Sequence, residues 1–543
     1  MKKSIIFLCF MAIFLKGSSQ MVFENPNNEV YQYLSRLSHK GIIEFDDLIL
    51  PVSRTTINRK LQEAQAHIDA LSAIEKKELS FYIRNFSLYN QQDTTTYTKF
   101  LATNKQGAWS SFAANSKSFF ITADPLIQYS QNHYNGKSFD HRAIGVQVWG
   151  AIGEHIGFQF TAKDVTESRN IANADLFQNN SPGFVNLITS PTSKSLNFTE
   201  YKANIGYSWK NGQINFGQDL FTWGYGENGR MVLSDKSPIN PYIRIDYQPL
   251  KWLKFNYAHL WLNSNVIDSS SNYSFNNPVY GGTRVTFIPK FLATHSITIT
   301  PKKGIDISLG ESMVYSDKLN VGYLIPLMFF KAFDNNSSNY NILAGSNGQF
   351  FFQASLKNVL PKTHFYTTLF IDEIKVSTIF NKKESRNQIG YNLGASVTDF
   401  LLPYLTLYSE YSRVNPSVYN NINPAQTYTS YGFNLGDWMG NNFDRILLGA
   451  RYTPVAKLKL EARYQWIRKG AATTIAQQYL AQPQPAFLFE KLYEQKELYL
   501  NASYEFKRNI YFKANYTITN TIYPVGLNNT KYNNYSLGVN FGL

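Results

Sequence analysis

The stretch YSLGVNFGL (residues 535–543) places apolar side chains at every second position, with small or polar residues between them. Because successive side chains of a β-strand point to opposite faces, this alternation predicts a strand with one apolar and one polar face. Tyr535, Leu537 and Val539 lie on the apolar face, and Ser536 and Gly538 lie on the other. One such strand fits a soluble sandwich as well as a membrane barrel, so its meaning depends on how often the pattern recurs.

The same alternation recurs in two clear hairpins. In the first, residues 143–152 and 156–163 each alternate apolar with small or polar side chains on either side of a Gly-Glu turn. In the second, residues 201–209 and 214–216 flank Asn211-Gly212, a pair that favours a type I′ turn. Both hairpins are therefore predicted to have one lipid-like face.

Tight turns alternate along the chain with long connections rich in Asn, Ser and Gly. Turn signals occur at 301–304, 454–457 and 507–509, and long connections cover 170–195, 263–277 and 470–485. Short turns at one rim and long loops at the other are typical of outer-membrane barrels. We predict an all-β, antiparallel transmembrane barrel of roughly 16–18 strands over residues 109–543, with the strand of residues 535–543 closing it.

The N-terminus predicts a secretory signal peptide over residues 1–19. Lys2 and Lys3 precede an apolar stretch at residues 5–15, and small residues follow. The single cysteine, Cys9, lies within that stretch, so we expect a mature chain without disulfide or lipid anchor. No later run reaches the roughly 20 apolar residues that a membrane-spanning helix requires.

Residues 20–90 differ from the rest of the chain because their apolar residues recur at helical spacing. Ser72 and Glu75 form a capping box before the last of these segments. We expect a small periplasmic α-helical module of roughly three helices, followed by a polar linker over residues 91–108.

Composition agrees with a barrel. The chain is 16% aromatic, with 37 Tyr and 40 Phe, which suits aromatic girdles around a polar interior. Its formal net charge of +14 suits anionic lipopolysaccharide or an acidic polysaccharide. An exported chain is not expected to meet nucleic acid, so the expected partners are outer-membrane lipid, polysaccharide and, during biogenesis, the barrel-assembly machinery.

The segment WGYGENGR (residues 223–230) contains a formal GxGxxG motif. Dinucleotide binding would need a helix to begin there, and the following MVLS does not begin one. Two interpretations remain open. Either the segment is a flexible loop whose Trp, Tyr, Glu and Arg side chains contact sugars, or its glycines let it fold back into the lumen, which the aromatic rings then fill.

Enzyme signatures are weak. The eight His residues lack metal-ligand spacing, and neither a GxSxG motif nor a P-loop occurs. Asp372 and Glu373 are adjacent, so on a regular strand they point to opposite faces and do not suit a glycosidase pair. We expect no catalytic residue, no metal and no cofactor.

Several motifs together resemble the Wzi-type capsule-assembly family of outer-membrane proteins. WGxG at 223–226, with LS at 233–234 and SP at 237–238, is similar to one family motif, and FIDE (370–373) resembles its acidic strand. EYSRVNP (410–416), with Tyr419 and the later YG and LG pairs, matches its most distinctive run. Met231-Val232 departs conservatively from a Leu-rich tract. The resemblance implies an 18-stranded barrel, a helical module at its base and a role in holding polysaccharide.

We therefore predict a non-enzymatic protein of a Gram-negative outer membrane that binds or organises capsular or exopolysaccharide at the cell surface. A porin or transporter, or a gliding or adhesion component, are the alternatives. Glu410 and Arg413 should face opposite ways, and a structural ladder across the barrel wall is the other interpretation of these charges. The candidate polysaccharide-binding residues are Trp223, Tyr225, Glu227, Arg230, Arg244, Glu410, Arg413, Asn415, Tyr419, Tyr428, Trp438 and Asp444.

Overall fold

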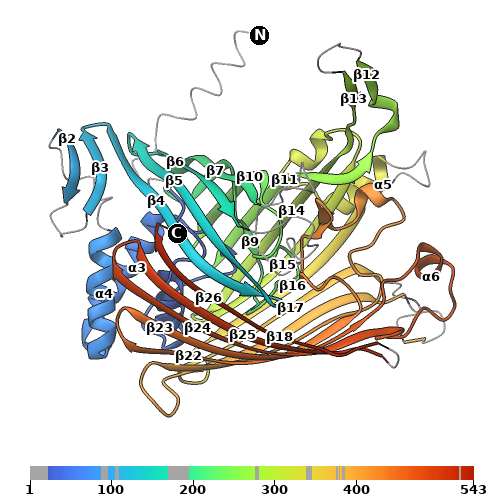
Figure 1. Cartoon of the computed structure of the whole chain (residues 1–543). Helices are drawn as coiled ribbons and strands as arrows, with labels where there is room; N and C mark the ends of the chain where they lie inside the picture. The colour runs from blue at the N-terminus through green and yellow to red at the C-terminus, as the bar shows by residue number, and fades with distance from the viewer. Residues whose placement is uncertain are drawn as a thin grey trace, which may run out of the picture.

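A computed structural model describes residues 22–86, 96–103, 109–168, 195–275, 281–337, 345–374, 377, 380–381, 386–524 and 527–542 (Figure 1). The expected signal peptide, residues 1–19, lies outside the described residues. Nearly all of the long connection predicted at 170–195 also lies outside them.

The chain forms a closed barrel of 18 antiparallel strands, as predicted. The strands are β4 (Phe119–Tyr134), β5 (Lys137–Ile152), β6 (Ile156–Glu167), β7 (Leu196–Trp209), β8 (Gly212–Asp219), β10 (Asn240–Leu250), β11 (Leu253–Ile267), β14 (Phe287–Lys302), β15 (Ile305–Ser316), β16 (Asn347–Lys357), β17 (Thr363–Glu373), β18 (Gln388–Thr398), β19 (Leu405–Val414), β22 (Phe443–Val455), β23 (Leu458–Gly470), β24 (Lys491–Lys507), β25 (Ile510–Ile522) and β26 (Thr530–Phe541). β26 closes the barrel by pairing with β4, which places Tyr535 opposite His133 and Phe541 opposite Ile127. The prediction of a closing strand is therefore confirmed.

The apolar faces of the predicted strands point outward. Tyr535, Leu537 and Val539 of β26 are exposed on the outer surface, as are Ile144 of β5 and Tyr201 of β7. Because apolar side chains recur at alternate positions on neighbouring strands, the barrel presents an outer band suited to lipid.

The outer band ends at a row of charges on β19 and the three strands that follow it in the barrel. Strand register aligns three successive outward rows: Ser409, Leu448, Tyr464 and Leu498; then Tyr411, Ile446, Trp466 and Lys496; then Arg413, Asp444, Arg468 and Glu494. The change from mainly apolar to aromatic to charged side chains is the pattern expected where hydrocarbon gives way to the lipid headgroups.

The hairpin turn after β7 lies one residue earlier than predicted. Trp209 pairs with Gly212, so Lys210 and Asn211 form the turn, and neither has the positive φ that a type I′ turn requires. A left-handed pair occurs instead between β4 and β5, at Asn135 (φ 49°) and Gly136 (φ 78°). In this region it is therefore Asn135-Gly136, and not Asn211-Gly212, that forms the left-handed turn.

The helical module is present at the N-terminal end. It contains α2 (Val30–His39), β1 (Ile49–Leu50), α3 (Arg54–Ala66), the 3₁₀ helix η1 (Ile68–Ala70) and α4 (Ala73–Phe86). The predicted capping box forms, because Ser72 N donates to Glu75 Oε2 at 2.8 Å and Glu75 N donates to Ser72 Oγ at 3.3 Å. Apolar side chains of α2, α3 and α4 pack into one buried core.

The module packs against the short-turn end of the barrel (Figure 1). Lys357 at the end of β16 pairs with Asp47 at 2.6 Å, and Lys254 on β11 pairs with Asp46 at 2.7 Å. β1 also pairs with β9 (Thr222–Trp223), a short strand inside the barrel. The module is therefore joined both to the rim and to the interior of the lumen.

Part of the expected linker is a strand. β2 (Tyr97–Thr103) pairs with β3 (Trp109–Ser116), and β3 pairs with the first residues of β4, before the stretch of β4 that pairs with β26. The prediction of a linker over residues 91–108 is therefore wrong for β2. Its adjacent apolar residues, Phe100 and Leu101, break the alternation that marks the other strands.

The opposite end of the barrel carries the long connections. It holds the hairpin of β12 (Tyr273–Phe275) and β13 (Gly282–Arg284), the helices α5 (Phe330–Ser337) and α6 (Ile475–Tyr479), the 3₁₀ helices η4 (Ser269–Ser271), η5 (Val321–Leu324) and η7 (Pro424–Gln426), and the pair β20 (Thr429–Ser430) and β21 (Phe433–Asn434). Among the described residues, no helix is both long and apolar enough to cross a membrane.

Candidate functional site

Two segments predicted to carry function meet inside the barrel. Residues 220–239 follow β8, and residues 415–442 follow β19; we call the two together the lumenal plug. Tyr419 Oη donates to Met231 O, and Tyr428 Oη donates to Val232 O, each at 2.9 Å. The backbone N–H of Ser234 donates to Leu435 O at 2.8 Å. The two segments thus form one packed unit.

A buried ion cluster joins the plug to the barrel wall. Glu410 on β19 accepts hydrogen bonds from Glu227 N at 2.9 Å and from Tyr366 Oη at 2.7 Å. Arg445 on β22 lies 2.8 Å from Asp437 Oδ2 and 3.6 Å from Glu410 Oε1, and all three side chains are fully buried. Glu410 therefore belongs to a structural ladder between wall and plug, the alternative left open for it.

The glycines of the GxGxxG motif allow close packing. Gly224 and Gly229 have φ values of 115° and 137°, which L side chains rarely adopt. A Cβ on Gly229 would lie 2.4 Å from Asp437 Oδ2, and a Cβ on Gly226 would lie 2.0 Å from Gly229 O. The segment folds back into the lumen, as the second interpretation expected.

Four aromatic candidates are buried in the plug. Trp223 and Tyr428 have no exposed surface, and Tyr225 and Tyr419 are at most 5% exposed. Tyr419 and Tyr428 stack on each other with ring centroids 5.5 Å apart. The expectation that these four rings stack on sugar is not supported, because a continuous apolar core covers their faces.

Trp438 differs from these four rings because it is only partly buried. Its indole packs at the edge of the plug core, and Nε1 donates to Asn228 O at 2.8 Å. The ring keeps some exposed surface beside this hydrogen bond, and the Arg445 guanidinium lies 6.0 Å from the ring centroid. Of the predicted aromatic candidates, Trp438 is the one that is not buried.

Three charged candidates have internal partners. Arg244 Nη1 donates to Pro51 O at 2.8 Å, and Arg244 Nε lies 2.8 Å from Asp246, so this residue anchors the module. Arg230 pairs with Asp235 at 3.1 Å, and Glu227 pairs with Arg451. Arg230, Glu227 and Arg244 hold the plug and module in place.

Arg413 and Asp444 lie on the outer face of the wall, directly opposite each other on β19 and β22. The prediction that Glu410 and Arg413 face opposite ways is confirmed. The Arg413 guanidinium stacks over Phe487 at 3.7 Å, and its Nε donates to Asn415 Oδ1 at 3.1 Å. Asp444 pairs with Arg468. These residues belong to the charged row above the apolar band, at the end that carries the long loops.

The carboxylates of Asp372 and Glu373 have separate partners. A register irregularity separates Ile371 from Glu373, so the strand is not regular at this point. Asp372 accepts from Tyr419 N at 2.6 Å, and Glu373 accepts from Gln388 Nε2 at 2.8 Å. Within the described part of the chain, no group of three His, Cys, Asp or Glu residues could hold a metal ion.

The sequence did not single out Arg445 or Asp437, the residues that complete the buried cluster with Glu410. Both lie far from Glu410 along the chain, and no local motif marks them. Only the period-two pattern of β22, which places Arg445 on its inward face, could have suggested its role.

Comparisons with known proteins bear on the fold. No protein-family model and no curated protein matches the chain. Among solved structures, Wzi of Escherichia coli, described as an outer-membrane protein involved in group 1 capsule assembly and a carbohydrate-binding β-barrel, matches with a TM-score of 0.58 and 12% identity over 97% of this chain and 100% of Wzi. The chain shares the fold of Wzi.

Other outer-membrane barrels match less well. OccK3 (OpdO) of Pseudomonas aeruginosa gives a TM-score of 0.41 at 12% identity, over 78% of this chain and 95% of OccK3. OprD of the same species gives 0.42 at 10% identity, over 78% and 94%. These scores are too low to support a functional argument. The likeness to Wzi is a distant structural relationship, and the outer-membrane barrel fold is consistent with an outer-membrane location.

Proposed function

We propose that this protein is a non-enzymatic barrel of the outer membrane that binds capsular or exopolysaccharide at its loop-bearing rim and holds it at the cell surface. The observation that carries the proposal is the filled lumen. The plug is joined to the wall by the buried cluster of Glu410, Arg445 and Asp437, and two tyrosine hydroxyls tie its halves together. A lumen closed in this way favours a binding or scaffolding role over passage of solutes.

The accessible candidates lie near the loop-bearing rim. Trp438 keeps a partly free ring, Arg413 is the charged side chain stacked on Phe487, and Asn415 lies beside it. Aromatic rings stack on sugar faces, and guanidinium groups pair with acidic groups. Each contact is weak, and affinity would come from repetition along a polymer. The charged row that includes Arg413 would also meet lipopolysaccharide headgroups.

A polymer pull-down tests the proposal. Full-length protein in detergent is mixed with the purified surface polysaccharide of its own cells, and bound polymer is recovered with the protein. We expect polymer to be recovered with the protein, and we expect a large excess of free polymer to abolish this recovery. Recovery no greater than that with an unrelated outer-membrane barrel would contradict it.

A further inference from the structure

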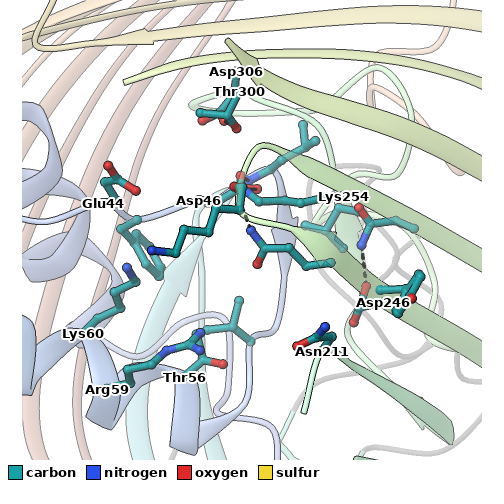
Figure 2. A pocket seen from close by; sticks show the side chains of 18 of the residues that line it. Glu44, Asp46, Thr56, Arg59, Lys60, Asn211, Asp246, Lys254, Thr300 and Asp306 are labelled. Atoms are coloured by element: carbon teal, nitrogen blue, oxygen red, sulfur yellow. Dashed lines mark hydrogen bonds and ion pairs between the residues drawn. The ribbon is translucent and has the colours of Figure 1, made fainter. Parts of the chain in front are cut away.

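A cavity of about 670 Å³ lies between the helical module and the short-turn end of the barrel (Figure 2). Module residues such as Glu44, Arg59 and Lys60 line one side. Ends of the barrel strands line the rest, from Trp209 at the end of β7 to Asn358 after β16. Short turns face the periplasm in outer-membrane barrels, so this cavity is on the opposite side of the membrane from the long loops.

Asp306 is a buried carboxylate that no cation of the described residues contacts directly, although Lys254 and Lys357 lie near enough to act on its charge. It is 8% exposed, and one of its oxygens accepts from Thr300 Oγ1 at 2.5 Å. No second hydrogen-bond donor and no ion pair to Asp306 occurs among the residues that the structure describes. The two nearby lysines have their own partners, Lys254 with Asp46 and Lys357 with Asp47. A free oxygen at the cavity wall is therefore left to accept from a ligand.

The cavity also carries free positive charge. Figure 2 shows Arg59 on the far side of the cavity from Asp306. Arg59 and Lys303 are exposed, and neither forms an ion pair with any described residue. Amide side chains are present as well, and Gln213 and Asn256 both donate to Asp246, at 2.5 and 2.6 Å. The lining thus combines the free acceptor of Asp306 with exposed cations that form no ion pair with described residues, and apolar side chains such as Ile43, Leu48 and Leu250 complete it.

We propose that this cavity binds a short acidic stretch of the same polysaccharide, with sugar hydroxyls donating to Asp306 and an acidic group paired with Arg59 and Lys303. A hydroxyl is the donor that suits Asp306, because a cationic donor would be repelled by Arg59 and Lys303. Hydrogen bonds to a buried ionised group are stronger than neutral ones. The volume falls within the range of ligand pockets, roughly 300–1,000 Å³.

The inference rests on the proposed polysaccharide role and adds a second contact at the periplasmic rim. Because its lining comes from both module and barrel, a bound glycan would join the two. Binding to the folded state alone raises the unfolding temperature, so the ligand should stabilise the docked module.

The test uses full-length protein in detergent, with tetragalacturonic acid as the acidic probe and maltotetraose as the neutral one. Affinity is measured by calorimetry, and folding of each variant is checked by its heat-modifiable mobility on gels. The variants are Arg59→Glu, which alters an exposed side chain, and Asp306→Asn. Lys318→Glu makes the same charge change as Arg59→Glu, at the opposite rim.

The wild type and Lys318→Glu should bind tetragalacturonate with equal affinity, and each cavity variant should bind it at least tenfold more weakly. Maltotetraose should bind more weakly than the acidic probe. The inference is overturned if the wild type does not bind tetragalacturonate, if Arg59→Glu binds it as tightly as the wild type, or if both probes bind equally. If the native polymer is still recovered in the pull-down under any of these outcomes, only the cavity is rejected and the proposed function stands.

Discussion

The carboxylate of Glu410 on the barrel wall accepts a hydrogen bond at 2.9 Å from the backbone N–H of Glu227, which lies 183 residues earlier in the chain. A wall carboxylate thus holds a loop that fills the lumen. Because Arg445 and Asp437 are fully buried beside it, this contact belongs to a buried charged unit, and removing one member leaves the remaining charges less well balanced.

Replacing Glu410 with Gln should destabilise the protein by about 2–3 kcal/mol. Arg445 would keep Asp437, so the effect should fall short of the ~3–5 kcal/mol expected when a buried charge loses its whole partner. Denaturant unfolding followed by tryptophan fluorescence measures the change. Glu494→Gln, at an outward ion pair with Lys491, is the matched control and should cost no more than about 1 kcal/mol. Equal losses of unfolding free energy in the two variants would show that the cluster does not stabilise the plug.

The wild-type barrel should not conduct ions in a planar bilayer. Replacing residues 416–441 with a short Gly-Ser linker removes half of the plug and should open a stable conductance, because it takes away Asp437 and both stacked tyrosines. Heat-modifiable mobility confirms that the variant remains a barrel. Steady conductance by the wild type would instead favour a porin.

Docking of the helical module should weaken in acid. Burial, with a further contribution from Lys357, lowers the pKa of His39 to about 3, below the ~6.5 of an unfolded chain. Between these values the unfolded state binds a proton that the folded state excludes, so stability falls by up to about 1.4 kcal/mol for each unit of pH below about 6.5. His39 is surrounded by Lys357, Asp47, Arg451 and Arg36, and by the ring of His364, which is tilted relative to it with ring centroids 4.5 Å apart.

Protonation of Asp47 causes a second loss of stability at lower pH. Burial opposes its ionisation, but the ion pair with Lys357 holds the pKa of Asp47 below its ordinary value. Its stabilising contribution is complete above about pH 4 and disappears as the pH falls further. After correction for intrinsic rates, hydrogen exchange in residues 22–86 should quicken from pH 7.5 to 4.5, where His39 acts, and should quicken further below about pH 4, where Asp47 also contributes. His39→Phe keeps a ring and should reduce the change; an unaltered profile would contradict the assignment.

Substitutions of Trp438 and Tyr419 should separate the effect on polymer binding from the effect on the free energy of unfolding. Trp438→Ala removes the accessible ring and should weaken polymer binding about tenfold, within the ~1–1.5 kcal/mol of an aromatic contact. Tyr419→Phe removes only the hydroxyl that bonds to Met231 O, and should lower stability by about 1 kcal/mol with binding unchanged. Loss of polymer binding in Tyr419→Phe alone would instead place the glycan site in the buried core of the plug.

The alternation of apolar and polar residues predicts most of the barrel, because every strand has lipid on one side and a polar or packed interior on the other. The pattern of residues 535–543 correctly predicts the outward face and a closing strand, and the structure shows that this strand pairs with β4. Alternation says little where it is interrupted, and β2 was missed for that reason. The turn after β7 was misplaced because an Asn-Gly pair favours a turn without determining the register of the flanking strands.

The candidate site was less predictable because a filled lumen and a sugar-binding surface use the same residue types. Trp223, Tyr419 and Tyr428 could stack on glycans or on one another, and only the folded chain shows that they are buried. Asp437 and Arg445 meet Glu410 through strand register and loop packing over long sequence separations. Such contacts leave no local motif in the sequence.

The central claim, that this barrel holds polysaccharide at the cell surface, is tested most directly by deleting the gene and measuring polymer in the cell-bound and medium fractions. The account predicts that total polymer stays the same while most of it moves to the medium, and that the wild-type gene restores retention but Trp438→Ala does so only partly. Polymer that stays cell-bound in the deletion strain would contradict the account, and a motility defect with normal retention would favour a gliding role instead.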